Sequence, residues 1–549
     1  MTTHSSGRSA HVDTFCADSL PPKELWPRMD CSTLPELVYP ARMNCAVELL
    51  DATVGAGRGD NVVFVHEDTR WTYTELLERA NRIAHVLVED LGVVPGNRVL
   101  LRAPNTPMLA ACWFAVLKAG GVVVATMPLL RPREIAYTAG RARISLALTD
   151  SRVAADCERA MLSADYGNAD TGNRVVQFNT TAPGGLEAMM RAKPSSFASC
   201  DTTSSDIALI AFTSGTTGRA KGTMHTHRDV MAITDCFARH VLRPDSTDVF
   251  CGSPPLAFTY ALGGLLLFPM RFGASTLMLE QASPPNLVKA IQEHRPTVCF
   301  TAPTAYRAML GMLNEFDVSS LRKCVSAGET LPATTLEAWE RATGVRIIDG
   351  IGATEMLHIF ISASGDDIRP GSTGRAVPGY EARIVDENFE PVPPGVVGLL
   401  QVRGPTGCRY LDDPDRQRAY VRDGWNVTGD SYMMDRDGYF WYQARSDDMI
   451  VSSGYNIAAP EVENALLTHP AVRECAVVGL PDEERGHIVK AFVVLHEHVR
   501  DVSPSVKDLQ DHAKREIAPY KYPRAIEFVD ALPRTDTGKL QRFRLKEPT

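Results

Sequence analysis

Apolar residues recur along this chain with two spacings, and the alternation between them predicts the body of the fold. Short apolar runs bounded by Gly or polar residues predict buried strands at residues 120–126 and 207–212. Apolar positions three and four residues apart predict helices at residues 109–118 and 227–237. The alternation predicts a large α/β region. Further strands of the same kind are predicted at residues 275–279, 298–301 and 323–326.

The pattern changes after Gly379, where shorter β-like segments with Pro and Gly turns between them predict a small β-rich subdomain. A charged segment at residues 445–448 then precedes a last run with both strand and helix patterns. We therefore expect three parts along the chain. They are a loosely ordered lead-in of residues 1–40, a large N-terminal domain of residues 41–446, and a small α+β C-terminal domain of residues 447–549.

Composition narrows the class of protein. The 549 residues exceed a single hydrophobic core, and 44% apolar with 22% charged residues is ordinary for a soluble multidomain protein. A net charge of -9 disfavours a nucleic-acid or anionic-membrane partner, so small molecules are the expected partners. The twelve cysteines form neither a C-x-x-C pair nor a metal-spaced cluster, and we find neither a signal peptide nor a membrane-length apolar stretch. The expected location is the cytoplasm, and a homodimer is compatible with these features.

Residues 213–222, Thr-Ser-Gly-Thr-Thr-Gly-Arg-Ala-Lys-Gly, are rich in groups that bind phosphate, and we call them the phosphate loop. Glycines let backbone N–H groups face a ligand, the hydroxyls add donors, and Arg219 and Lys221 add positive charge. The spacing is not that of the Walker motif, which disfavours an ordinary kinase or GTPase. A plain surface loop is the alternative. The phosphate-binding candidates are Thr213, Ser214, Gly215, Thr216, Thr217, Gly218 and Lys221.

Four more motifs follow the phosphate loop, and their order and spacing identify a family. They are Asp-Gly-Ile-Gly-Ala-Thr-Glu at 349–355, Gly-Trp-Asn-Val-Thr-Gly-Asp at 424–430, the segment 445–457 and the segment 533–542. The series closely resembles the adenylate-forming superfamily of acyl-CoA synthetases, luciferases and peptide-synthetase adenylation domains, over about residues 45–545. The resemblance implies that ATP and the acid bind where a large N-terminal domain meets a small mobile C-terminal domain.

The resemblance also implies roles for single residues. Activation of a carboxylate by ATP releases pyrophosphate and needs cations and N–H donors around the phosphates. Thr354 is then expected at the α-phosphate and Glu355 at Mg²⁺, while Asp349, Gly350, Asp430 and Arg445 contact the AMP portion. For Glu355 and Asp430 the plain alternatives are a surface carboxylate and a turn aspartate. Ala444 stands before Arg445 where the family usually has Gly.

Three further roles concern the C-terminal domain. Lys539 matches the family lysine that bridges the carboxylate and the α-phosphate, although a lysine in such a turn is otherwise only solvated. Asp447 matches the hinge about which this domain rotates after adenylation. Ser453, which is often Gly in the family, and Gly454 match the tunnel for the pantetheine thiol of CoA.

The resemblance implies an acyl-pocket wall at residues 254–264, where Phe258 and Tyr260 flank Thr259. Amino-acid-activating members of the family carry an aspartate near Ala257 or Phe258 to pair with the α-ammonium, and this chain has none, so an α-amino acid is disfavoured. Residues 355–361 and 326–332 are most similar to the benzoate-CoA ligase branch, and Leu-Ala-Phe-Thr-Tyr is nearest to 2-aminobenzoate enzymes. His358 either hydrogen-bonds an ortho substituent of the acid or only packs beside the pocket. Phe258 and Tyr260 either face the acid or are core residues. The pocket candidates are Phe258, Thr259, Tyr260, Ala327, Gly328, His358 and Ile359.

These features predict a magnesium-dependent, AMP-forming aryl-CoA ligase that activates 2-aminobenzoate with ATP and transfers it to CoA. Benzoate and 2-hydroxybenzoate remain alternative acids, and a separate acyl carrier protein remains an alternative acceptor. A catalytically silent nucleotide-binding protein with the same fold is a third alternative, which the presence of Lys221, Glu355, Asp430, Arg445 and Lys539 disfavours.

Overall fold

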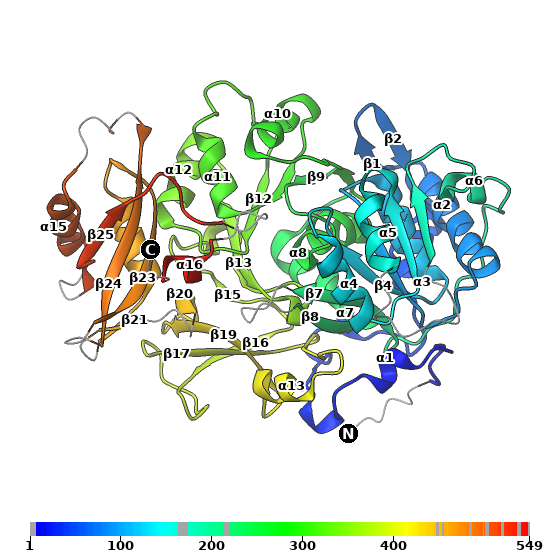
Figure 1. The fold of residues 1–549 in the computed structure, drawn as a ribbon, viewed down its shortest axis with the longest axis horizontal. Helices are drawn as coiled ribbons and strands as arrows, with labels where there is room; N and C mark the ends of the chain where they lie inside the picture. The colour runs from blue at the N-terminus through cyan, green and yellow to red at the C-terminus, as the bar shows by residue number, and fades with distance from the viewer. Residues whose placement is uncertain are drawn as a thin grey trace.

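The structure is a computed structural model that describes residues 7–162, 174–213, 220–445, 450–452, 455–482, 486–497, 499, 504–517, 521–534 and 540–546. Two large sheets and a smaller β-rich sheet form the N-terminal region, and a three-stranded sheet with its helices forms the C-terminal region at the left of Figure 1. This arrangement confirms the predicted α/β fold, with a β-rich subdomain and a small α+β C-terminal part. Among the described residues, no helix has the length and apolarity needed to span a bilayer.

The first large sheet has six strands in the order β6-β5-β3-β4-β7-β8. It is parallel except for β8, which pairs antiparallel with β7. Every residue of the adjoining helix α3 (Pro107–Lys118) is buried, as expected for a helix that is apolar all round. The strands are β3 (Arg98–Arg102), β4 (Val122–Thr126), β5 (Leu146–Asp150), β6 (Arg174–Phe178), β7 (Ile207–Thr213) and β8 (Lys221–Thr226).

The second large sheet has nine strands in the order β15-β14-β13-β12-β11-β9-β10-β1-β2. Its centre, from β1 to β13, is parallel, so the carboxyl ends of β11, β12 and β13 meet at one edge, where ligands bind in open α/β sheets. The strands are β1 (Val62–His66), β2 (Thr69–Thr72), β9 (Val249–Gly252), β10 (Ser275–Leu277), β11 (Val298–Thr301), β12 (Lys323–Ala327), β13 (Ile347–Gly352), β14 (Ile359–Ser362) and β15 (Arg375–Ala376).

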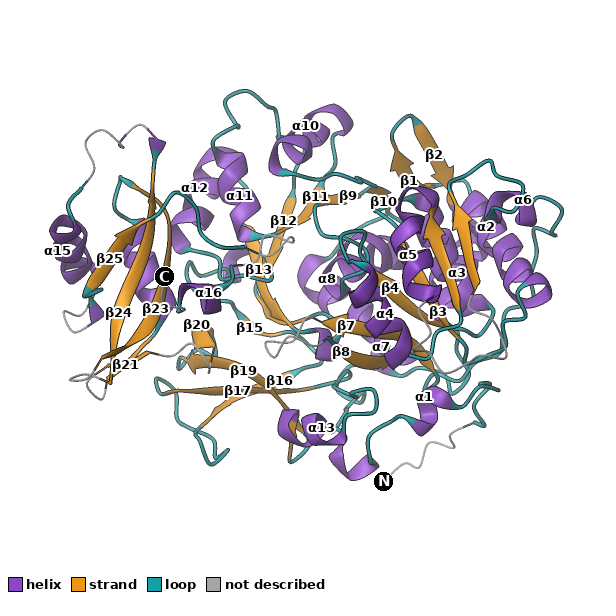
Figure 2. Cartoon of the chain, viewed as in Figure 1, coloured by secondary structure: helices purple, strands orange, loops and turns teal. Residues whose placement is uncertain are grey.

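Helices gather around the two large sheets, and few accompany the β-rich subdomain (Figure 2). The helix predicted at 227–237 is α7 (His227–Ile233) continued by the π-helix η8 (Thr234–Leu242). The remaining α-helices of this region are α1 (Phe15–Asp18), α2 (Tyr73–His85), α4 (Pro132–Arg141), α5 (Ala154–Leu162), α6 (Leu186–Met190), α8 (Thr259–Ala261), α9 (Phe268–Phe272), α10 (Pro284–His294), α11 (Pro303–Leu310), α12 (Ala333–Thr343) and α13 (Pro414–Tyr420).

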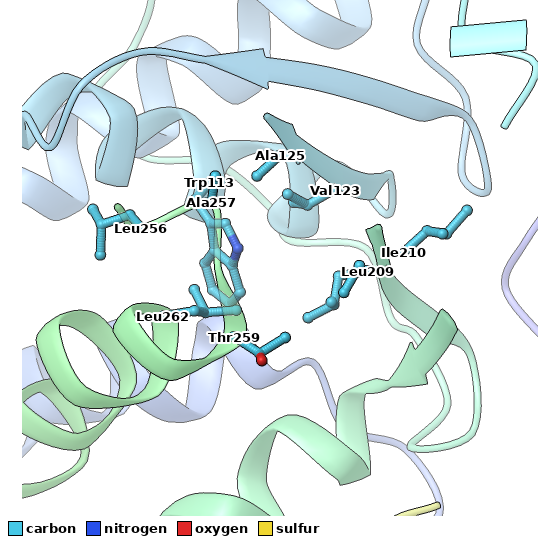
Figure 3. A pocket seen from close by; sticks show the side chains of 10 residues that line it. Trp113, Val123, Ala125, Leu209, Ile210, Leu256, Ala257, Thr259 and Leu262 are labelled. Carbon is cyan, nitrogen blue, oxygen red and sulfur yellow. The ribbon is translucent and has the colours of Figure 1, made fainter. Parts of the chain in front are cut away.

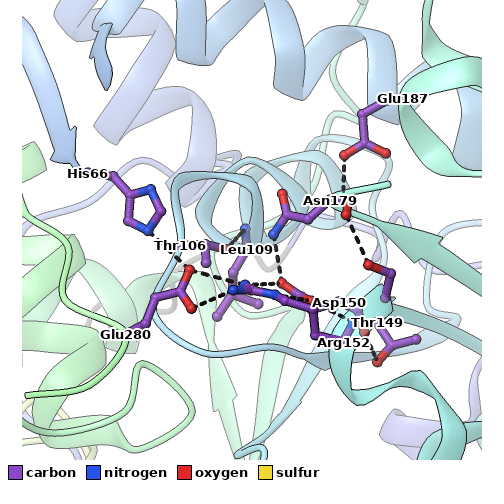
Figure 4. Close-up of polar contacts among 10 residues, drawn as sticks. His66, Thr106, Leu109, Thr149, Asp150, Arg152, Asn179, Glu187 and Glu280 are labelled. Atoms are coloured by element: carbon purple, nitrogen blue, oxygen red, sulfur yellow. Dashed lines mark hydrogen bonds and ion pairs between the residues drawn. The ribbon is translucent and has the colours of Figure 1, made fainter. Parts of the chain in front are cut away.

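A polar network joins the two large sheets at one end (Figure 4). Arg152 bridges two carboxylates, with 2.7 Å to Asp150 at the end of β5 and 2.7 Å to Glu280 beyond β10. Glu280 also lies 3.1 Å from His66 on β1, and Asn179 donates to Asp150 across 2.7 Å. Because the Asp150 side chain is fully buried, this network fixes the two sheets against each other.

The β-rich subdomain forms as predicted after Gly379. Its strands are β16 (Glu381–Val385), β17 (Val397–Arg403), β18 (Val421–Arg422), β19 (Trp425–Met434) and β20 (Phe440–Arg445). The C-terminal part contains β21 (Ile450–Ser452), β22 (Tyr455–Ile457), α14 (Ala459–Leu467), β23 (Val472–Asp482), β24 (Gly486–Leu495), α15 (Val506–Glu516), β25 (Ala525–Phe528) and α16 (Arg542–Leu545).

Residues 7–40, expected as a loosely ordered lead-in, pack against the N-terminal body. Asp13 pairs with Arg98, the side chain of Cys16 is fully buried, and the Arg28 amide donates to the Gly424 carbonyl across 2.8 Å.

An ion-pair cluster joins the C-terminal part to the body. Arg534 lies 2.7 Å from Glu474 and 3.7 Å from Glu329, while Arg307 on α11 lies 3.6 Å from Glu474.

Candidate active site

The strands on either side of the phosphate loop pair as a β-hairpin. Thr213, the last residue of β7, pairs with Lys221, the first residue of β8. The helix predicted at residues 227–237 does begin at His227, and the residues between it and the loop form the strand β8, which the sequence pattern did not predict. Thr226 caps that helix through a reciprocal pair of hydrogen bonds with Asp229, which explains its starting point. Ser214, Gly215, Thr216, Thr217 and Gly218 lie outside the described residues.

Thr354 and Glu355 lie in a single 3-10 turn, η10 (Thr354–Met356), between β13 and β14. The tight reversal of the chain here requires glycine at position 352, because a Cβ on that residue would lie 2.8 Å from the His358 carbonyl oxygen. Leu357, the residue after the turn, has φ 70°, a conformation unfavourable for a side chain of its size. Strand β14 then pairs antiparallel with β13, so the reversal projects the turn from the strand edge.

Three buried side chains from other segments fix the η10 turn, and each hydrogen-bonds a different residue of the turn. His225 on β8 donates from Nε2 to the Thr354 carbonyl across 2.8 Å, since a carbonyl can only accept. Tyr410 donates from its hydroxyl to Glu355 Oε1 across 2.6 Å, and Thr406 donates to the Met356 carbonyl across 2.8 Å. The two residues expected at the α-phosphate and at magnesium are therefore held by a rigid support.

Burial sets the protonation states behind this turn. Burial lowers the pKa of His225 to about 4, so the ring is neutral near pH 7 and keeps its proton on Nε2. Burial likewise raises the pKa of the Tyr410 phenol well above its usual range, which keeps it a donor. Arg409, which precedes Tyr410 in the chain, pairs with the buried Asp229 of the α7 cap.

The nucleotide residues lie on two separate sheets. Asp430 on β19 is the cross-strand partner of Arg445 on β20, which brings together two of the residues expected at the AMP portion. Asp349 lies on β13 opposite Ser326, and Gly350 lies opposite Ala327 on β12. Burial raises the pKa of Asp349 to about 7, although the Gly350 amide and Ser326 oppose the shift.

The predicted acyl wall is built around Tyr260 and His358. The Tyr260 hydroxyl donates to the carbonyl of Val325 across 3.0 Å, and its own carbonyl accepts from His358 Nε2 across 3.2 Å. The His358 ring packs edge-on against Phe268, 4.6 Å away, and over Gly263, where a Cβ would lie 2.4 Å from the ring. Hydrogen bonds and ring packing therefore fix Tyr260 and His358 against each other, while their contact with the acid stays a prediction.

His358 is only 3% exposed, and burial lowers its pKa to about 3. Because Nε2 donates to Tyr260, the neutral ring has a bare acceptor at Nδ1, and no hydrogen-bond partner reaches that atom among the described residues.

The other predicted pocket residues differ in burial. Ile359 follows in β14 and is buried, Ala327 is buried at the end of β12, and Phe258 is half-buried before α8. Gly328 is exposed with φ 91° and open space around it.

A cavity of about 20 Å³, room for one water-sized group, lies between the 256–262 segment and the six-stranded sheet (Figure 3). Thr259 and Ala257 line it together with Trp113 of α3, so Thr259 faces the six-stranded sheet. Sequence reasoning missed this cavity because its lining is indistinguishable from core. The other lining residues are Val123, Ala125, Leu209, Ile210, Ala211, Leu256 and Leu262.

The remaining predicted site residues are not placed. Asp447, Ser453, Gly454 and Lys539 lie outside the described residues, and only the backbone of Arg445 is described. Their roles stay predictions. Within the described part of the chain, no group of three His, Cys, Asp or Glu side chains could hold a metal ion. A single carboxylate such as Glu355 fits Mg²⁺, which keeps several waters and is bound largely by substrate phosphates.

Comparison with known proteins identifies the class. The AMP-binding enzyme family matches residues 51–409, and the AMP-binding enzyme C-terminal domain matches residues 461–539. The chain is 36% identical to benzoate–CoA ligase of Thauera aromatica over 94% of this chain and 98% of the relative. It is 33% identical to 3-hydroxybenzoate–CoA ligase of Aromatoleum sp. (strain CIB) over 92% of this chain and 97% of the relative.

A solved anthranilate CoA ligase, AuaEII in complex with anthranoyl-AMP, superposes with a TM-score of 0.85 at 35% identity, covering 94% of this chain and 98% of that chain. A benzoate CoA ligase from Burkholderia xenovorans LB400 gives a TM-score of 0.83 at 34% identity, covering 92% of this chain and 100% of that chain. The chain therefore belongs to the AMP-binding enzyme family. Within it, the chain is an AMP-forming acid–thiol ligase of the benzoate-CoA ligase branch, an aryl-CoA ligase that uses ATP and CoA.

Proposed function

We propose that this aryl-CoA ligase activates 2-aminobenzoate, forming 2-aminobenzoyl-AMP and then 2-aminobenzoyl-CoA. The observation that carries the choice of acid is the bare Nδ1 of the buried, neutral His358. An acceptor of this kind pairs with an N–H donor on the ring and gains nothing from plain benzoate. The similarity to an anthranilate CoA ligase supports the same choice.

The residues divide the first half-reaction among them. Lys221 and the phosphate loop hold the β- and γ-phosphates, while Asp430 and Arg445 hold the ribose of ATP. Thr354 contacts the α-phosphate, where the carboxylate of the acid attacks, and Lys539 bridges these two groups. Glu355 would hold Mg²⁺, which neutralises charge that develops on the phosphates as pyrophosphate leaves.

The second half-reaction uses the same pocket with a different arrangement of the C-terminal part. Rotation about Asp447 withdraws Lys539 and presents Ser453 and Gly454 to the pantetheine chain of CoA. The thiol then attacks the acyl carbon and AMP leaves. One pocket thereby serves both steps, and the acid is selected once. We further propose that the enzyme works in the cytoplasm, consistent with its twelve free thiols.

The experiment is a turnover assay with ATP, Mg²⁺ and CoA on 2-aminobenzoate, benzoate and 2-hydroxybenzoate, with each product identified by mass. The proposal predicts the highest kcat/KM for 2-aminobenzoate. A hydroxyl also donates a hydrogen bond, so 2-hydroxybenzoate should rank above benzoate. Equal use of all three acids would contradict ortho recognition, and pyrophosphate release without a CoA product would indicate a carrier-protein acceptor.

A further inference from the structure

The segment from Thr406 to Leu411 extends the phosphate-loop hairpin by one strand-like piece. The Met224 amide donates to the Arg409 carbonyl across 2.8 Å, and the Leu411 amide donates to the Gly222 carbonyl across 2.9 Å. Thr223 and Tyr410 form an antiparallel bridge between these bonds. The backbone of this segment is therefore fixed relative to the strand that leaves the phosphate loop.

The same segment reaches the η10 turn through two side chains. Tyr410 donates to Glu355 Oε1 across 2.6 Å, and Thr406 donates to the Met356 carbonyl across 2.8 Å. Tyr410 is 1% exposed and packs edge-on against Tyr420, with ring centroids 5.8 Å apart. A buried ring on a hydrogen-bonded backbone has little freedom to move its hydroxyl, so the position of Glu355 Oε1 is determined by Tyr410.

We propose that Tyr410 is a positioning residue for the magnesium nucleotide: from a backbone that is hydrogen-bonded to β8, it occupies Oε1 of Glu355 and thereby leaves Oε2 for the metal. The inference rests on the proposed role of Glu355 at Mg²⁺. The phenol takes one of the two carboxylate oxygens and restricts the side chain to one rotamer. Partners that orient metal-binding carboxylates in this way typically contribute 10- to 100-fold in metal affinity.

The test compares Tyr410→Phe with a matched control, Tyr39→Phe. Tyr39 also donates its hydroxyl to a carboxylate, Asp235 Oδ2, across 2.9 Å, and Asp235 has no part in the site. ATP affinity is measured by calorimetry over a series of Mg²⁺ concentrations, without the acid. We expect the Mg²⁺ concentration that gives half of the affinity gain to rise 10- to 100-fold in Tyr410→Phe. It should stay within twofold of the wild type in Tyr39→Phe.

Melting curves are recorded first, so that binding is measured at a temperature at which both variants are folded. An unchanged Mg²⁺ response in folded Tyr410→Phe would overturn the proposal. Glu355→Gln separates this failure from a failure of the metal assignment, because a full Mg²⁺ response in Glu355→Gln would refute the role of Glu355 itself. In the Glu355→Gln background, Tyr410→Phe should cause no further change, and an independent additional loss would also overturn the proposal.

Discussion

His358 donates a hydrogen bond from Nε2 to the backbone carbonyl of Tyr260 across 3.2 Å. This bond connects the segment just after the η10 turn, which contains Glu355, to the helix α8 in the predicted acyl wall. It also fixes the tautomer of the ring, because the proton that Nε2 donates is not available to Nδ1. The group that would recognise the acid and the turn that would bind the α-phosphate thus belong to one rigid piece of structure.

Replacement of His358 by Phe should abolish the preference for 2-aminobenzoate. Phe keeps an aromatic ring at this position but lacks the acceptor that Nδ1 provides. The value of kcat/KM for 2-aminobenzoate should therefore fall at least about tenfold relative to that for benzoate. The comparison of two acids within one variant cancels any general loss from the missing bond to Tyr260. Proportional losses for both acids would instead show that His358 only packs the wall.

Asp349 should leave a pH signature in stability. Its pKa is about 7 in the folded protein against an ordinary value of 3.8, so between these values the folded chain holds a proton that the unfolded chain has released. Stability contributed by this group is therefore lost as the pH rises from 4 to 7. Asn does not titrate, so Asp349→Asn should gain stability relative to the wild type over this range, by up to about 4 kcal/mol.

Denaturant unfolding of both proteins from pH 4 to pH 8 measures this difference directly. The control is Asp511→Asn, because Asp511 on α15 is only partly buried and its ion pair is with Lys514, three residues further along the same helix. Parallel stability curves for the wild type and Asp349→Asn would show that the Asp349 carboxyl ionises normally in the folded protein.

Lys539→Ala should separate the two half-reactions. Loss of a donor that contacts developing charge costs about 10² to 10³ in rate, so pyrophosphate release should fall by that factor. A supplied 2-aminobenzoyl-AMP should still be converted to the CoA thioester. Lys514→Ala, which removes a lysine paired with Asp511 in the same domain, should affect neither step. An equal loss in both steps would remove Lys539 from its assigned role.

Asp447→Pro should impair the second half-reaction and spare the first, the reverse of the effect expected for Lys539→Ala. Proline fixes φ and restricts the preceding residue, so it should hinder rotation about this position. We expect adenylation to persist and thioester formation to stop, whereas Asp447→Ala should retain both. Single-turnover measurement of AMP-ester decay with CoA gives the result, and normal decay in the proline variant would place the hinge elsewhere.

Local patterns in the sequence were sufficient for most of the fold. The strand at 298–301 forms with the predicted bounds, and the strand at 207–212 is only one residue longer than predicted, because a short apolar run between turn residues strongly favours a buried strand. The hairpin at the phosphate loop was not foreseen. The residues of β8, such as Lys221 and His225, are polar, and their burial depends on partners in distant segments.

The support behind the site was equally hidden from sequence reasoning. Tyr410 is 55 residues from Glu355, and His225 is 129 residues from Thr354, so no local spacing relates them. The motifs themselves, by contrast, gave Asp430 and Arg445, which the β19–β20 pairing places side by side. Short-range motifs thus indicated what the site handles, while the tertiary structure revealed what holds it in place.

A competition between 2-aminobenzoate and benzoate in one reaction measures the choice of acid directly. Equimolar 2-aminobenzoate and benzoate are supplied together with ATP, Mg²⁺ and CoA, and the ratio of the two thioesters is measured by mass at low conversion. That ratio, at equal concentrations, equals the ratio of the two kcat/KM values. The account predicts an excess of 2-aminobenzoyl-CoA of more than about tenfold, or roughly 1.4 kcal/mol. An equal ratio, or an excess of benzoyl-CoA, would contradict it.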